Sequence, residues 1–80
     1  MPNVLRIQSY RLYFYSHEPN EPSHIHIDRE KFSAKFWLQP IRLAKNYGFN
    51  ATELRTLRNL TEEHQQHLLE SWNEYFNIEN

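Results

Sequence analysis

The residues best suited to chemistry are densest near position 24, where His24, His26 and Asp28 stand at every second position. In an extended strand, residues spaced in this way project to the same side. Two histidines and a carboxylate are a ligand set that non-haem iron and catalytic zinc use, with open positions for substrate. Such a site needs a further ligand, for which His17 is the nearby candidate. If a metal is bound, we expect it at His24, His26 and Asp28.

The same histidine pair suits acid–base catalysis on RNA, because histidine titrates near neutral pH. One ring would take the proton of a 2′-hydroxyl group and the other would protonate the leaving group. His24 and His26 are then the candidate catalytic residues, and this chemistry requires no cofactor. A third interpretation is structural, with both histidines hydrogen-bonded to the loop around Pro19–Pro22 and fixing its shape. The sequence leaves these three alternatives open.

Alternating polar and apolar residues predict the strands that would position these side chains. We expect strands at 4–7, 10–15, 24–28 and 33–38, while 41–44 is either a further strand or a helical turn. The loop at 16–23 contains two prolines and is long for a connection between paired strands, a length often found in functional loops. Gly48, the only glycine, is expected in a turn at 46–48 with a positive φ angle.

A helix should follow, because Asn50 and Glu53 have the spacing of a helix-capping pattern. The residues behind it form an apolar stripe at helical spacing: Leu54, Leu57, Leu60, Leu68, Trp72, Tyr75 and Phe76. We expect one helix that ends at Asn77, although Thr61 could cap a second helix if the chain breaks near it.

These elements predict an α+β fold. Residues 1–80 are expected to form a single small domain. Its first part, 1–49, would be an antiparallel sheet of three to four strands. A long C-terminal helix, 50–77, would pack across one face of that sheet.

Strand alternation divides the expected sheet into two faces. One face is apolar throughout and should pack against the helix: Leu5, Ile7, Leu12, Phe14, Ile25, Ile27, Ala34, Phe36 and Leu38. The other face combines the histidines and Asp28 with cations and aromatic rings: Arg6, Arg11, Tyr13, Tyr15, Lys35 and Trp37. Cations bind phosphates and flat rings stack on bases, so these six residues are candidates for binding nucleic acid or another phosphate-bearing ligand. The alternative is that the rings cover one another or a partner chain.

Charge is distributed unevenly along the chain. The net charge is −1, but residues 1–50 carry +3 and residues 51–80 carry −4. A basic first part joined to an acidic second part suggests two surfaces with different partners. The chain has no cysteine, which excludes disulfides, thiol catalysis and cysteine-ligated metals. It has no apolar run of the length of a signal peptide or a membrane span, so we expect a cytoplasmic protein.

Several segments of the chain, taken in order, resemble a known family. They are Met1-Pro2-x-Val4-Leu5-Arg6-Ile7, Tyr10-Arg11-x-x-Phe14-Tyr15-Ser16, Glu21-Pro22-x-His24-Ile25-His26, Ala34-Lys35-Phe36-Trp37-Leu38, Gly48-Phe49 and Glu70-x-Trp72-Asn73-Glu74-Tyr75-Phe76. Together they resemble the small bacterial family known as domain of unknown function 4160, whose hallmark is the Pro-x-His-x-His element. One departure follows the second histidine, where many members carry a glycine and this chain has Arg29-Glu30-Lys31-Phe32.

The resemblance implies a bacterial or phage origin and supplies no catalytic residues. Members are often encoded beside another small protein, in arrangements that look like toxin–antitoxin pairs, and some are described as transcriptional regulators. We therefore hypothesise a toxin-like component of a toxin–antitoxin-type module that binds or cleaves RNA, with a cognate small protein as its partner. The alternatives are a non-catalytic module that binds a partner protein or DNA, and a small metal-binding protein that uses His24 and His26.

Overall fold

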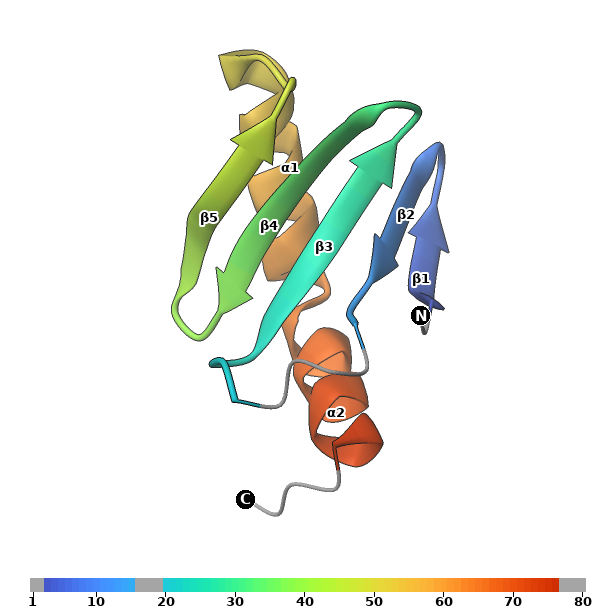
Figure 1. Ribbon diagram of the computed structural model, residues 1–80, viewed down its shortest axis with the longest axis vertical. Coiled ribbons are helices and arrows are strands. Elements are labelled where there is room, and N and C mark those ends of the chain that lie inside the picture. Colours follow the sequence, from blue (N-terminus) through green and yellow to red (C-terminus); the bar gives the residue numbers. More distant parts are fainter. Residues whose placement is uncertain (1–2, 16–19, 77–80) are drawn as a thin grey trace.

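In the part of the chain that the structure describes, five antiparallel strands form a single sheet (Figure 1). The structure is a computed structural model and describes residues 3–15 and 20–76. The strands are β1 (Asn3–Ile7), β2 (Tyr10–Tyr13), β3 (His24–Arg29), β4 (Phe32–Leu38) and β5 (Ile41–Tyr47). Their order in the sheet follows the chain, so β1 and β5 are the two edges. The expected α+β class is confirmed, and the expected three to four strands are corrected to five.

The fifth strand contains a β-bulge, which explains why the sequence pattern left it undecided. Leu43 pairs with Phe36 and Lys45 pairs with Lys35, so Ala44 is an extra residue without a partner on β4. A bulge shifts the alternation of the two faces by one residue. The pattern of β5 therefore matches neither a regular strand nor a helical turn.

Three turns contain residues with positive φ: Gln8 between β1 and β2 (54°), Glu30 between β3 and β4 (56°) and Gly48 after β5 (110°). The angle at Gly48 confirms the expectation for the only glycine, although the strand before it extends through Tyr47. A Cβ atom at Gly48 would also collide with the ring of Phe32. Glu30 takes the left-handed conformation at the turn where many members of the resembled family carry a glycine.

Two helices follow the sheet where one was expected, so the prediction of a continuous helix over 50–77 is wrong. They are α1 (Ala51–Glu63) and α2 (Gln65–Tyr75), and His64 separates them with φ −108° and ψ 13°. Thr61 does not cap the second helix, because its hydroxyl group donates to the carbonyl of Leu57 within α1 (2.8 Å). The expected helix end at Asn77 lies outside the described residues.

The first turn of α1 is fixed to the sheet. Asn50 is the N-cap, since its side-chain oxygen accepts a hydrogen bond from the backbone N–H of Glu53 (2.8 Å). The Glu53 carboxylate accepts two hydrogen bonds from Arg29 on β3 (2.6 and 2.8 Å) and one from Tyr10 on β2 (2.7 Å). Hydrogen bonds from Arg29, and then from Tyr10, hold the pKa of the Glu53 carboxyl below its usual value.

The core lies between the sheet and the helices, as the two-face prediction requires. Leu12, Ile25, Ile27, Ala34, Phe36 and Leu38 of the sheet are almost fully buried, together with Leu57, Leu68 and Trp72 of the helices. α1 packs against β4 and β5, whereas α2 lies across the end of the sheet (Figure 1). No helix within the described ranges is long and apolar enough to cross a membrane.

Candidate functional site

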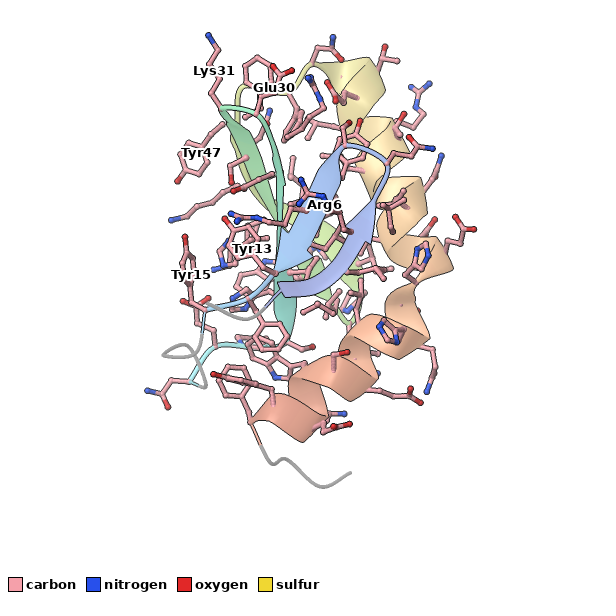
Figure 2. The ribbon with its side chains drawn as sticks, turned by 90° about the vertical axis from the view of Figure 1, so that its right-hand side faces the viewer. Arg6, Tyr13, Tyr15, Glu30, Lys31 and Tyr47 are labelled. Atoms are coloured by element: carbon pink, nitrogen blue, oxygen red, sulfur yellow. The ribbon has the colours of Figure 1, made fainter. Side chains whose placement is uncertain are left out.

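The strand register arranges the open face of the sheet, which is turned away from the helices, in three rows. The first row consists of Arg6, Arg11, Asp28, Ser33 and Tyr47. The second consists of Tyr13, His26, Lys35 and Lys45, and the third of His24, Trp37 and Arg42. Figure 2 shows Tyr13, Tyr15 and Tyr47 on the side opposite the two helices. The structure thus places all the sequence-predicted site residues on one face, where they differ in depth.

A pocket of about 240 Å³ opens in the second row of this face. The polar and aromatic side chains in its wall are Tyr13, Tyr15, Glu21, His26, Ser33, Lys35, Lys45 and Tyr47. Tyr47 is 60% exposed, so much of its ring is open to a ligand. The pocket therefore combines aromatic rings, an imidazole and two lysines within one small space.

His26 is the histidine that belongs to this pocket. Its ring stacks on that of Tyr13 (centroids 5.3 Å apart, planes at 18°) and meets the ring of Tyr15 edge-on (4.7 Å). The side chain remains partly exposed. These ring contacts fix the orientation of His26 while leaving it within reach of a ligand.

His24 is completely buried, with 0% of the residue exposed. Its Nδ1 donates a hydrogen bond to the carbonyl oxygen of Pro22 (2.9 Å). Its ring contacts the rings of Trp72 on α2 (centroid distance 4.8 Å) and Trp37 on β4 (5.7 Å). This environment matches the structural interpretation of the sequence, in which the histidine fixes the preceding loop. The two histidines share a face and lie close together (5.1 Å), but only His26 lines the pocket.

Tyr13, in the wall of the pocket, forms a polar cluster with Arg11 and Asp28 beside it. Asp28 accepts hydrogen bonds from the hydroxyl of Tyr13 (3.0 and 3.1 Å) and from Arg11 (3.2 Å), whose guanidinium lies 4.7 Å from the centre of the Tyr13 ring. Burial raises the pKa of Tyr13 far above its usual value, and hydrogen bonding to Tyr15 and Asp28 adds to the shift. The side chains of Tyr13, Arg11 and Asp28 therefore bind mainly to one another and stabilise this surface, which leaves them few polar atoms for a ligand.

The two lysines of the pocket differ in their partners. Lys35 is 9% exposed, forms an ion pair with Glu21 (2.5 Å) and lies over the ring of Trp37 (4.7 Å). Lys45 is opposite it on β5, is exposed, and has no ion-pair partner in the part of the chain that the structure describes. An incoming anion therefore meets one neutralised cation and one free one.

No group of three histidine, aspartate or glutamate side chains among the described residues is placed to hold a metal ion. Asp28 is engaged by Tyr13 and Arg11, and His24 is turned to Pro22. His17, the expected further ligand, lies outside the described residues.

Sequence reasoning missed four polar or aromatic residues of the pocket: Glu21, Ser33, Lys45 and Tyr47. Regular alternation over 41–47 places Lys45 and Tyr47 on the same face as Ile41 and Leu43, so the strand pattern alone would have assigned both to the apolar face. The bulge at Ala44 turns both side chains to the open face instead. Glu21 is in the loop before β3, where strand alternation gives no prediction.

The fold and this face define a small α+β domain with an open sheet surface rich in cations and aromatic rings. The chain belongs to the family of domain of unknown function DUF4160, whose model matches residues 9–73. The match confirms the resemblance and includes the loop and strand that carry Pro22, His24 and His26. Neither a curated protein nor a solved structure matches this chain.

Proposed function

We propose that this protein binds single-stranded RNA on the open face of its sheet, as the toxin-like component of a toxin–antitoxin-type module. The observation that supports this function best is the pocket that His26, Lys45 and Tyr47 share. Exposed rings stack on unpaired bases of any sequence, and lysines neutralise phosphates. Single-stranded RNA offers both groups together, whereas a duplex hides the faces of its bases.

The charges around the pocket also favour a polyanion. Arg6 and Arg42 are exposed on the same face as Lys45, in the rows on either side of it. The acids of the face, Glu21 and Asp28, are each already paired with a cation. A strand of RNA crossing the three rows would meet free positive charge at several points.

The depth of the histidines favours binding over cleavage. Cleavage by paired histidines needs two rings in contact with the reacting atoms. His26 is placed to make such contact, but His24 is enclosed by Trp37, Trp72 and Pro22. We therefore propose His26 as a ligand-contacting residue and His24 as a residue that fixes the loop.

A titration of labelled single-stranded RNA, followed by fluorescence anisotropy at several salt concentrations, tests the binding function. Tyr47→Ala should weaken binding about 5- to 150-fold, which corresponds to one lost stacking contact. Lys45→Gln should reduce the slope of log K against log salt by about 0.7, the value for one phosphate contact with a single strand. Duplex RNA of the same length should bind more weakly.

Matched controls come from the helix side of the molecule. Tyr75→Ala removes an exposed tyrosine from α2, and Arg55→Gln removes one positive charge from α1. Equal losses in these controls, or no RNA binding at low salt, would refute the proposed face. Growth arrest on expression tests the toxin-like role, and arrest that persists when Lys45→Gln and Tyr47→Ala are combined would contradict it.

A further inference from the structure

β5 is an edge strand with an unused side. It pairs with β4 along one side, and no other strand of the described chain pairs with its outer side. Figure 1 shows β5 at the left margin of the sheet, with α1 behind it. An edge of this kind presents backbone N–H and C=O groups to which an extended segment can add as a further strand.

An apolar groove lies beside this edge, on the helix side of the sheet. It has a volume of about 280 Å³, and Phe36, Leu43 and Leu54 supply its apolar surface. Leu43 is 46% exposed, one of the few large apolar side chains with that much open surface. Such a groove suits an apolar side chain of a segment that pairs with β5.

Four cations surround the edge. Arg42 and Lys45 lie on the open side of β5, while Arg55 and Arg58 of α1 line the groove on the other side. Within the described ranges, none of the four has an ion-pair partner. The edge is therefore complementary to negative charge on both of its sides.

We infer that the β5 edge and its groove dock an extended segment of a partner protein in which apolar and acidic residues alternate. Pairing with β5 would turn alternate side chains of that segment to opposite sides. The apolar ones would enter the groove beside Leu43, and the acidic ones would face Arg42 and Lys45. Further acids near the ends of the segment would reach Arg55 and Arg58.

A second copy of this chain is a poorer occupant. Antiparallel pairing of two β5 strands about a two-fold axis would bring Arg42 and Lys45 near the same residues of the other copy, and like charges opposite each other destabilise a sheet. RNA is also a poorer fit, because the groove offers aliphatic surface beside its two arginines and a nucleotide has no aliphatic side chain to bury there. The inference does not depend on RNA binding, since the groove lies on the other side of the sheet from the pocket of Tyr47.

Fluorescence anisotropy with synthetic peptides and the full chain tests the inference. The probe is a labelled peptide of the length of β5 in which valine and glutamate alternate. It should bind at a ratio of one to one, whereas a peptide of alternating valine and lysine should not bind. Two N-methylated versions of the peptide test backbone pairing. N-methyl groups on the glutamates block one backbone edge of the peptide, and N-methyl groups on the valines block the other. The version whose blocked edge faces β5 should not bind.

Variants of the protein separate the groove from general charge attraction. Leu43→Asn should weaken binding about tenfold, the effect of losing one apolar contact. The pair Arg42→Glu with Lys45→Glu should reverse the preference toward the valine–lysine peptide, because the charged side chains of the peptide face these two residues. The controls are Arg6→Glu, a charge reversal on the opposite edge strand, and Tyr75→Asn, the loss of a similarly exposed large side chain on α2.

Hydrogen exchange gives the direct readout, because peptide binding should protect the amides of β5 more than those of β1. Equal binding of both peptides, insensitivity to Leu43→Asn, or an equal loss in the controls would overturn the inference. Concentration-dependent dimers that protect β5 without peptide would instead assign the edge to a second copy. If the Tyr47→Ala variant loses RNA binding but still binds the peptide, this inference stands. The experiments therefore distinguish failure of the proposed RNA binding from failure of the peptide docking.

Discussion

Truncation of His24 to alanine distinguishes an interior histidine from a ligand-contacting one. The ring is fully buried among Trp37, Trp72 and Pro22. Truncation of a large buried side chain to alanine costs about 2–5 kcal/mol, because the cavity closes only in part. An 80-residue domain has a total stability of roughly 4–12 kcal/mol, so His24→Ala removes a large part of it.

The loss is measurable as a shift in melting temperature. Taking about 3 kcal/mol as the cost, and about 4–8 °C for each kcal/mol in a domain of this size, the midpoint should fall by about 12–24 °C. His26→Ala should cost only about 0.5–1.5 kcal/mol, because the ring is partly exposed and loses mainly its stacking contacts with Tyr13 and Tyr15. Circular dichroism during heating gives both midpoints.

RNA affinity should change in the opposite order. At a temperature well below its midpoint, folded His24→Ala should bind RNA like the unchanged protein, while His26→Ala should bind more weakly. His24→Phe is the second variant, because it keeps a ring in the space and removes the polar contacts of the imidazole, among them the hydrogen bond to Pro22, which is worth about 1 kcal/mol. The reasoning is refuted if His24→Ala melts at the unchanged temperature, or if the folded variant loses RNA binding as His26→Ala does.

Two further predictions concern the frame around the site. Gly48→Ala should lower the melting midpoint by at least about 8 °C, because the positive φ angle and the collision with Phe32 each cost about 1–3 kcal/mol; an unchanged midpoint in a thermal melt would contradict this. The pKa of Glu53 is lower in the folded protein than in the unfolded chain, so its ion pair with Arg29 stabilises the fold fully at pH values above the unfolded pKa. This stabilisation is lost as the pH falls through the pKa of the folded state. Urea midpoints measured from neutral to acid pH should therefore fall less steeply for Glu53→Gln, and parallel curves would show that the pair does not contribute.

Strand alternation predicted the two faces of the sheet correctly. The apolar set is buried, apart from the partly buried Leu5 and Ile7 on the edge strand, and the polar set lies opposite, because the period of two is a property of the strand itself. The pattern failed where the backbone departed from that period. At Ala44 a bulge adds one residue, so β5 and the pocket residues Lys45 and Tyr47 could not be assigned.

Depth within a face was not predictable from alternation. His24 and His26 have the same place in the pattern, yet α2 reaches around the end of the sheet and covers only His24. The break that lets α2 take this direction was raised only as an alternative near Thr61, because Leu57, Thr61, His64 and Leu68 keep helical spacing across its actual place at His64. Burial of this kind depends on tertiary packing between segments far apart in the chain.

The cluster of Tyr10, Arg29 and Glu53 joins three elements that are distant in sequence. Glu53 has the position of a capping-box glutamate, but its carboxylate is bound by strands β2 and β3 instead of closing the box. The start of α1 therefore relies on contacts made 24 and 43 residues away along the chain. Local opening of this corner must release the strand ends and the first helical turn together, so that the three behave as one cooperative unit.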